Sequence, residues 1–317
     1  MREEHPSVSV CTIAFNHAHC IQDCIKGVQN QSYAGQIQHV IADDCSTDST
    51  WERIRAATKI QNRVHYRLIR NPENQGPEKN FIEAVQACQG DFIALCEGDD
   101  FWIEETKLER QIRILEKYPE AAMTTHECYK IHFPPGKFRS YKRVVKMIFW
   151  DTLTYGLRGT FDLARAAFAG PDLFWAKERA HLEGRRKMLY SLEDYSNRRW
   201  IQPFCSILMR RDVADALVSV LQESKGGHQA ALLLGCIFGG IRHIRTPMAV
   251  KRDQQSSITL NELLKSENRQ RDRDPTKNNE RKRYEALMKY ATADQRCVLK
   301  KMINDSLAQI SGKMEKN

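Results

Sequence analysis

One stretch of the chain decides the fold. Residues 71–102 read NPENQGPEKNFIEAVQACQGDFIALCEGDDFW. Apolar residues recur at helical spacing over 81–88, and Gly90 then stops the predicted helix. The short apolar run 91–96 predicts a buried strand, which ends directly in the acidic sequence EGDD at 97–100. A helix, a buried strand and a carboxylate cluster in this order indicate an α/β sheet with polar groups at one edge.

The same alternation of helical and strand patterns extends outward from this stretch. Three more runs rich in β-branched residues predict strands at 7–14, 37–43 and 64–70. Helical patterns begin near Ile21 and Trp51, and another around Leu108 follows the acidic sequence. Such alternation implies right-handed βαβ units. The predicted fold class is therefore α/β, with a mostly parallel central sheet flanked by helices, and ligands bind at the carboxyl ends of its strands.

Composition places the chain among ordinary globular proteins. It has 317 residues, of which 41% are hydrophobic and 28% charged, enough to bury a sizeable core. Its longest apolar run, 230–241, is shorter than the roughly 20 residues that span a bilayer. Because the N-terminus shows no signal-peptide pattern, we expect a cytoplasmic protein. The ten cysteines form no CxxC pair, which predicts reduced, small core residues.

The net charge of +9 is concentrated in two segments, 137–146 and 265–283. A local excess of this kind suits an anionic surface, such as a membrane leaflet, or nucleic acid. A solvated loop and a solvated helix explain the charge equally well. No nucleic-acid-binding module is apparent, so we expect no nucleic-acid partner.

Acidic residues gather where the sheet should bind its ligand. Asp43 and Asp44 end the second predicted strand, and Glu97, Asp99 and Asp100 follow the fourth. Carboxylates repel one another, so a divalent cation such as Mg²⁺ or Mn²⁺ is the usual reason to collect them. The alternative is a turn in which Asp caps the following helix. No glycine-rich dinucleotide or P-loop motif is present, which argues against those enzyme classes.

Four motifs in order resemble the family 2 glycosyltransferases, which have a GT-A-type fold. The family reads roughly VSVIIPTYN, VDDGSTD, NxGxxxARN and LDxDD; this chain has VSVCTIAFN at 8–16, VIADDCSTDST at 40–50 and the stretch 71–102. EGDD, an aromatic pair and KLERQIRIL at 107–115 resemble one branch of the family. The resemblance is close over 7–118 and weaker to about 260.

The resemblance implies three parts of the chain. Residues 1–118 would form a nucleotide-sugar-binding half, and residues 119–260 an acceptor-binding and catalytic half with an insert at about 137–190. Residues 261–317 would be a basic helical C-terminal extension.

The resemblance also assigns a donor site. Its nucleotide and sugar contacts would be Ile13, Ala14, Asn16, Asp44, Lys79, Glu97, Asp99 and Arg252. Asp44 would accept a hydrogen bond from uracil or thymine. Lys79 stands where the family usually has Arg. Asp100, together with Asp99, would hold Mn²⁺ or Mg²⁺, which neutralises the leaving diphosphate.

Two catalytic positions depart from the family pattern. The family's general base is an Asp before an apolar helix, and this chain has His228 there; an imidazole titrates near working pH and is able to act as a base. The family's YRxH appears as KRDQ at 251–254, which retains Arg252 and replaces the His with Gln254.

The expected function is therefore metal-dependent, inverting transfer of a sugar from a nucleoside diphosphate, UDP or dTDP, to a glycan or lipid-linked acceptor in cell-surface polysaccharide biosynthesis. The basic segments would hold the protein at the cytoplasmic face of a membrane. The alternative, which rests on His228 and Gln254, is a catalytically weak or inactive nucleotide-sugar-binding relative that acts as a scaffold.

Overall fold

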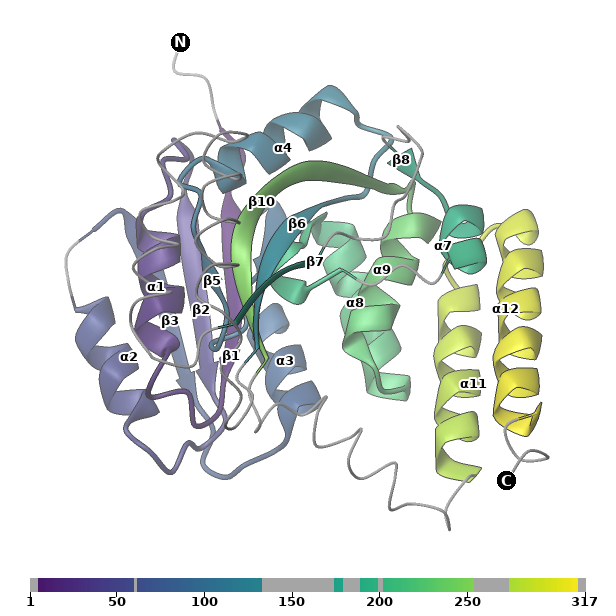
Figure 1. The fold of residues 1–317 in the computed structure, drawn as a ribbon, viewed down its shortest axis with the longest axis horizontal. Coiled ribbons are helices and arrows are strands. Elements are labelled where there is room, and N and C mark those ends of the chain that lie inside the picture. Colours follow the sequence, from purple (N-terminus) through teal and green to yellow (C-terminus); the bar gives the residue numbers. More distant parts are fainter. Residues whose placement is uncertain are drawn as a thin grey trace.

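A mixed sheet runs through the computed structural model, which describes residues 5–59, 62–132, 174–178, 189–198, 202–253 and 274–312. The strand order is β3-β2-β1-β4-β9-β6-β10-β5, with β7 paired to β6 and β8 to β10. Helices cover both faces of this sheet (Figure 1). The described part thus has the α/β layering that the sequence predicts.

The N-terminal half is built from parallel strands joined by helices. β1 pairs with β2 and β4, and β2 pairs with β3, all in parallel. Two predicted strands match the structure residue for residue, because turn sequences bound their apolar runs sharply. The elements are β1 (Val8–Ala14), α1 (Ile21–Gln29), β2 (Ile37–Asp43), α2 (Thr50–Thr58), β3 (Val64–Arg70), α3 (Pro77–Gln86) and β4 (Phe92–Leu95).

The middle of the chain adds antiparallel pairs and returns to the acidic edge. β9 lies antiparallel between β4 and β6. β10 runs parallel to β6 and antiparallel to β5, whose Phe101 directly follows the acidic turn. The elements are β5 (Phe101–Trp102), α4 (Lys107–Lys117), β6 (Met123–His132), β7 (Phe174–Glu178), β8 (Leu189–Tyr190), α7 (Leu192–Arg198), η1 (Phe204–Ser206), β9 (Leu208–Arg210), α8 (Arg211–Glu223), α9 (Gly227–Ile237) and β10 (Ile241–Asp253).

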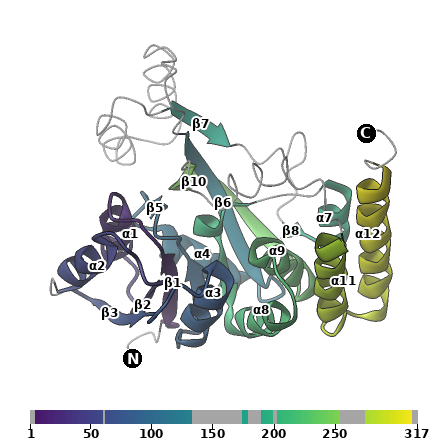
Figure 2. The same ribbon diagram turned by 90° about the horizontal axis from the view of Figure 1, so that it is seen from below.

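The C-terminal extension is helical, as predicted. α11 (Asp274–Met288) and α12 (Ala293–Gly312) lie side by side at the end of the molecule opposite β3 (Figures 1 and 2). α11 contacts α8 and α9, and α12 contacts α7. The basic segment 137–146 and residues 265–273 lie outside the described residues, as does most of the predicted insert.

The core has one cluster on each face of the sheet. One gathers residues of α3, α8 and α9 with those of the C-terminal helices, and the other gathers residues of α1 and α4. None of the ten cysteines, all of which are described, forms a disulfide; Cys45 is partly exposed and Cys297 exposed, so the core prediction is wrong for these two and confirmed for the others.

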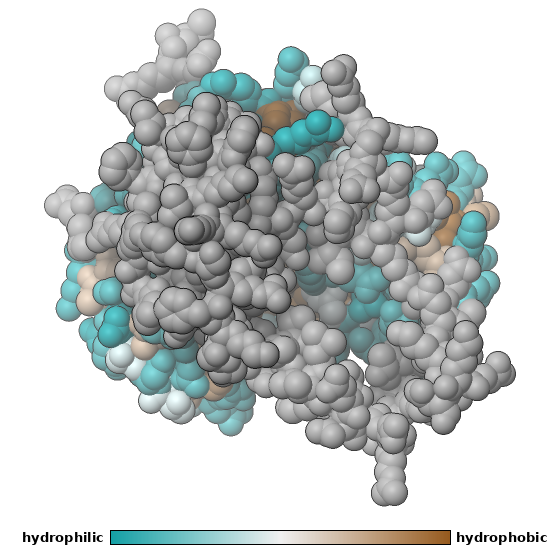
Figure 3. Space-filling model, viewed as in Figure 1, coloured by the Kyte–Doolittle hydropathy of each residue, from teal (hydrophilic) through white to brown (hydrophobic). Residues whose placement is uncertain are grey.

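Where described residues are visible in Figure 3, most are hydrophilic, with small hydrophobic groups near the top and at the right-hand edge. Among the described helices, none combines the length and apolar character that crossing a bilayer requires. Both observations agree with the composition of the chain.

Candidate functional site

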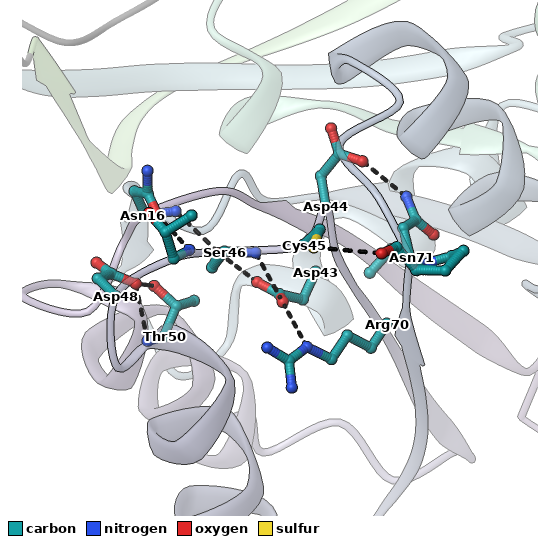
Figure 4. A network of polar contacts seen from close by, with 12 residues as sticks. Asn16, Asp43, Asp44, Cys45, Ser46, Asp48, Thr50, Arg70 and Asn71 are labelled. Atoms are coloured by element: carbon teal, nitrogen blue, oxygen red, sulfur yellow. Dashed lines mark hydrogen bonds and ion pairs between the residues drawn. The ribbon is translucent and has the colours of Figure 1, made fainter.

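The loop after β2 is held by its first carboxylate. Asp43 accepts hydrogen bonds from the backbone N–H of Ser46 at 3.2 Å and from the Ser46 hydroxyl, and its carboxylate lies 3.6 Å from Arg70 Nε (Figure 4). Burial raises the pKa of Asp43, and Ser46 and Arg70 oppose this shift. The buried carboxylate of Asp43 therefore stabilises the loop that follows β2.

Asp44 points to the other side of the same loop, toward Asn71 (Figure 4). Its Oδ1 accepts from Asn71 Nδ2 at 2.8 Å and from the backbone N–H of Gln75 at 2.9 Å. Its Oδ2 accepts from the backbone N–H of Gly76 at 2.9 Å. A carboxylate has about four acceptor positions, so these contacts leave one on Oδ2. Asp44 thus fixes the loop that leads into α3.

The residues after β1 connect the two acidic loops. The Ile13 carbonyl accepts from Gly98 N–H at 2.9 Å, and the Ala14 carbonyl accepts from Asp44 N–H at 2.9 Å. Asn16 has a left-handed backbone with φ of 57° and donates its N–H to Ser46 Oγ at 2.9 Å. The structure therefore brings these three predicted contact residues to the acidic edge.

Lys79, another predicted donor contact of the N-terminal half, lies on α3. It sits in the first turn of α3, which begins beyond the loop that Asp44 holds, and its side chain is exposed to solvent.

The three carboxylates of the acidic turn converge. Glu97, Asp99 and Asp100 each place an oxygen within 4.8 Å of the others. The Asp100 N–H donates to the Glu97 carbonyl at 2.9 Å and closes the turn. A side chain has no room at Gly98, where an added Cβ would lie 2.8 Å from His17 Nδ1. The glycine lets the turn pack tightly enough to gather the oxygens.

The environment of these carboxylates favours their neutral form when no cation is near. Burial raises the pKa of Glu97 to about 7, Asp99 adds to the shift and Lys251 opposes it. Burial also raises the pKa of Asp100, and the nearby Cys205, Asp99 and Glu97 add to that shift. A bound divalent cation would reverse both effects by favouring the charged carboxylates.

The two oxygens of Asp100 differ in their surroundings. Oδ1 accepts from the backbone N–H of Arg252 at 2.8 Å. Oδ2 is buried and has no hydrogen-bond partner among the described residues. Buried polar atoms normally have partners, and an exception of this kind calls for an unseen ion or water. With an all-oxygen donor set, the cluster fits Mg²⁺ or Mn²⁺.

The Arg252 guanidinium contacts the protein itself. Its Nη1 donates to the Asp99 carbonyl at 3.0 Å, and its Nη2 bonds to Asp23 of α1. It also lies over the Phe101 ring, 4.3 Å from the ring centre. In this arrangement Arg252 ties the acidic turn to α1 and β10. Whether it also contacts phosphate stays a prediction.

His228 lies in the first turn of α9. Its Nε2 contacts the Gln202 carbonyl, and its ring lies 4.8 Å from that of Phe204. Phe204 stacks in turn on Phe81 of α3, at 5.6 Å between centres. These contacts fix the orientation of the imidazole ring at the start of α9.

Two residues at this edge escaped the sequence reasoning. Phe15 is 41% exposed, although it is a large aromatic at the end of β1. Its place beside Asn16 in the first motif was the available signal. His17 packs against Gly98, and its Nδ1 is buried without a hydrogen-bond partner in the described part of the chain. In the sequence, His17 and His19 are spaced two residues apart, a pattern that predicts only a loop and a helix cap.

A family model, glycosyl transferase family 2, matches residues 9–184, which is more than half of the chain. The chain belongs to this family. The resemblance carried by the four motifs is thereby confirmed at the level of the family.

Curated relatives match part of the chain. An uncharacterised protein of Mycobacterium tuberculosis is 31% identical over 140 residues, covering 42% of this chain and 40% of its own length. The putative teichuronic acid biosynthesis glycosyltransferase TuaG of Bacillus subtilis is 34% identical over 110 residues, covering 35% of this chain and 42% of its own. The chain therefore spans about two fifths of the length of these relatives.

Solved structures extend the likeness to the whole fold. Staphylococcus aureus TarS 1-349 in complex with UDP covers 95% of this chain and 70% of its own, with 10% identity and a TM-score of 0.60. The mannosyltransferase PcManGT of Pyrobaculum calidifontis, in complex with GDP-Man and Mn²⁺, covers 99% and 81%, with 11% identity and a TM-score of 0.52. These neighbours confirm the predicted GT-A-type fold.

Proposed function

We propose that this chain is a metal-dependent, inverting glycosyltransferase of the EGDD-containing branch. It moves a sugar from a UDP- or dTDP-linked donor to a glycan or lipid-linked acceptor. The observation that carries the proposal is the buried Asp100 Oδ2, without a partner among the described residues, inside a cluster of three carboxylates at the carboxyl edge of the sheet. Membership of the glycosyl transferase family 2 supports a role for this cluster in sugar transfer.

Asp99 and Asp100 would hold the cation, with Glu97 beside it. When bound, Mn²⁺ or Mg²⁺ neutralises the charge that builds on the leaving diphosphate. The protein's part is to hold the acidic turn in place: the Arg252 N–H donates to the Asp100 carboxylate, and its guanidinium donates to the Asp99 main-chain carbonyl. The mannosyltransferase of similar fold contains Mn²⁺, which supports the choice of ion.

The acceptor capacity of Asp44 favours uracil or thymine over guanine. The one acceptor position that its neighbours leave matches the single imide N–H of uracil or thymine, whereas guanine offers two adjacent donors. The exposed ring of Phe15, at the end of β1, provides a face on which a base could stack. UDP is also the nucleotide in the TarS complexes.

His228 would remove the proton from the acceptor hydroxyl. Its Nε2 contacts the Gln202 carbonyl, which orients the imidazole ring. Proton removal by a positioned imidazole is a standard device of group transfer. Inversion at the anomeric carbon is carried by the family resemblance.

The acceptor and location are proposed from relatives and charge. A Campylobacter jejuni relative, 30% identical over 95 residues, is named a GalNAc(5)-diNAcBac-PP-undecaprenol beta-1,3-glucosyltransferase, a name that describes a lipid-linked acceptor. TuaG is named for teichuronic acid biosynthesis. We place this chain in cell-surface polysaccharide biosynthesis, at the cytoplasmic face of a membrane to which its basic segments would bind.

A second candidate is a nucleotide-sugar-binding scaffold with little or no activity. His228 packs between Phe204 and the Gln202 carbonyl. A histidine with a purely structural role would make the same contacts, and this packing therefore supports the scaffold. The scaffold binds the donor without turnover, and His228→Ala changes nothing that is measurable.

Calorimetric titration of UDP, dTDP and GDP, with and without Mn²⁺, tests the proposal. We expect metal-dependent binding of UDP or dTDP that is lost in Asp100→Asn. If no nucleotide binds, the transferase reading fails. If a nucleotide binds but none of a panel of nucleotide sugars is turned over, the scaffold reading is favoured.

A further inference from the structure

The helix that carries His228 is held at both ends by the C-terminal hairpin of α11 and α12. At its N-terminal end, the Lys225 N–H donates to Asn279 Oδ1 at 2.8 Å, and the Lys225 carbonyl accepts from Arg283 Nη1 at 2.9 Å. At its C-terminal end, Gln295 Nε2 donates to the Ile237 carbonyl at 2.9 Å. Figures 1 and 2 show the hairpin beside α8 and α9.

The turn before α9 is shaped to fit Arg283. Gly226 has a φ of 97°, a left-handed conformation that favours glycine. A Cβ added at Gly226 would collide with Arg283 Nη1. Arg283 therefore fills the space that a side chain at the turn would need, and the turn and the arginine fit only as a pair.

The opposite side of the same turn is bonded to the donor half. The Gly226 N–H donates to Glu78 Oε1 at 2.9 Å, and Glu78 lies in the first turn of α3. The turn at Lys225 and Gly226 thus has the N-terminal half on one side and the C-terminal hairpin on the other. Through it, α11 sets where the His228 end of α9 lies relative to the donor half.

Arg283 is buried rather than exposed on the surface. It is 5% exposed, and it lies beside Tyr284 and Leu287, which are 1% and 0% exposed. Its Nη2 is 3.4 Å from Glu280 of the same helix. Burying a guanidinium is costly unless its contacts are specific, so its bond to the turn is a fixed feature of this fold.

We propose that Arg283 is a positioning residue for sugar transfer, acting through the turn at Lys225 and Gly226 on His228. The proposal rests on the proposed function. The first N–H groups of a helix have no partner inside the helix, so groups outside it fix how the helix begins. His228 lies two residues after Gly226, and a displacement of about 1 Å at a reacting group costs on the order of 10²-fold in rate.

The experiment compares Arg283→Ala and Arg283→Lys with two control variants in the full chain. Gln295→Ala removes the contact at the other end of α9, and Arg281→Ala removes an exposed side chain of α11 that pairs with Glu285. Each variant is measured by hydrogen exchange along α9 and by UDP calorimetry with Mn²⁺. Its turnover is measured as UDP release from UDP-N-acetylglucosamine and UDP-glucose, with water as the acceptor of the sugar.

For Arg283→Ala we expect exchange at the first turn of α9 to rise by about tenfold or more, with little change at its last turn. The kcat for UDP release should fall by on the order of 10-fold to 100-fold, with UDP affinity unchanged. Arg283→Lys should restore part of the rate. Both controls should keep the wild-type kcat, and Gln295→Ala should raise exchange at the last turn only.

The proposal is overturned if Arg283→Ala keeps the wild-type kcat, or if UDP affinity and kcat fall together with exchange raised along the whole helix. Should Arg283→Ala fail to fold, Asn279→Ala weakens the same turn more gently and is judged by the same criteria. If the wild type binds neither UDP nor dTDP with Mn²⁺ and releases no nucleotide from their sugar derivatives, the proposed function fails, and Arg283 loses its positioning role with it. Hydrogen exchange at the first turn of α9 then still shows separately whether Arg283 fixes the conformation of the turn at Lys225 and Gly226.

Discussion

At the scale of single residues, the two oxygens of Asp100 in the acidic turn have different surroundings. Oδ1 accepts from the backbone of β10, and the buried Oδ2 has no hydrogen-bond partner among the described residues. Glu97 is held in an environment that resists its charge. Gathering these carboxylates is unfavourable when no cation is near, and this makes single substitutions informative.

Asp100→Asn should abolish metal-dependent nucleotide binding while the chain stays folded. The amide oxygen keeps the contact to the Arg252 N–H, but the anionic ligand is lost, so Mn²⁺ affinity should fall at least about tenfold. Calorimetry with Mn²⁺ and UDP measures the loss. Glu109→Gln, at an exposed position of α4, is the control and should bind as the wild type does.

The pKa of Glu97 predicts a pH dependence of metal binding. A proton competes with the cation as the pH falls through about 7, so Mn²⁺ should bind about tenfold more weakly at pH 6 than at pH 8. Glu97→Gln should bind Mn²⁺ more weakly, with a smaller dependence on pH that Asp100 alone sustains. A wild-type affinity that stays constant between the two pH values would contradict the assignment of Glu97 to the site.

The same raised pKa predicts an effect on stability without metal. Glu97 is neutral in the folded protein below pH 7 and ionised in the unfolded chain above its usual value near 4.5, so stability falls as the pH rises through this window. The cost at pH 8 is at most about 3 kcal/mol. In EDTA at pH 8, Glu97→Gln should therefore unfold at a higher temperature than the wild type, a difference that vanishes near pH 4.

His228→Ala separates the transferase from the scaffold. If His228 is the base, kcat should fall by on the order of 10² to 10⁴-fold, and UDP affinity should stay unchanged. His65→Ala, at an exposed position of β3, should leave both values at the wild-type level. Equal turnover by His228→Ala and the wild type would remove His228 from the mechanism.

At the scale of elements, the site depends on close contact between α1 and β5. An added Cβ at Gly27 of α1 would lie 2.8 Å from the backbone oxygen and 2.9 Å from the backbone nitrogen of Trp102. The helix therefore lies directly against the strand that follows Asp100. The Asp23 contact with Arg252 strengthens the same junction.

Gly27→Ala should push α1 away from β5 and disturb the acidic turn. Overpacking of this kind typically costs about 1–3 kcal/mol of unfolding free energy. Urea unfolding measures that cost, and Mn²⁺ calorimetry should show weaker binding. Lys26→Ala, at the exposed neighbouring position, should change neither, and an equally stable Gly27→Ala would mean that the junction adapts.

At the scale of the whole molecule, the excess of positive charge is concentrated in two segments of the sequence, 137–146 and 265–283. The segment 137–146 has five basic residues by sequence and none that is acidic: Lys137, Arg139, Lys142, Arg143 and Lys146. Its attraction to anionic lipid is a property that the sequence alone predicts.

The full chain should float with vesicles that contain anionic lipid and stay behind with neutral ones. Raising the salt concentration should release it, because screening shortens the range of the attraction. Lys142→Glu combined with Arg143→Glu should weaken flotation, whereas Arg113→Glu on exposed α4 is the control. Flotation that ignores both lipid charge and salt would contradict membrane binding through these segments.

The N-terminal half was predictable because its signals are local. Each strand there is a short apolar run bounded by turn residues, and each helix shows its own period. The antiparallel insertion of β9 between β4 and β6 left no such signal, since pairing between segments far apart in the chain depends on tertiary packing. The left-handed backbone at Cys45, with φ of 58°, stands where the family pattern has Gly.

The sequence by itself determined the family, the fold class and the acidic turn, because these rest on motif order and on residues that are neighbours along the chain. Only the tertiary structure decided which side-chain atoms of those residues form contacts within the protein. It engaged Arg252 with Asp99 and Asp23, left Asp100 Oδ2 without a partner among the described residues, and placed Arg283 under the turn before His228. These outcomes depend on contacts between distant segments, and no local pattern encodes a contact whose partner lies elsewhere in the chain.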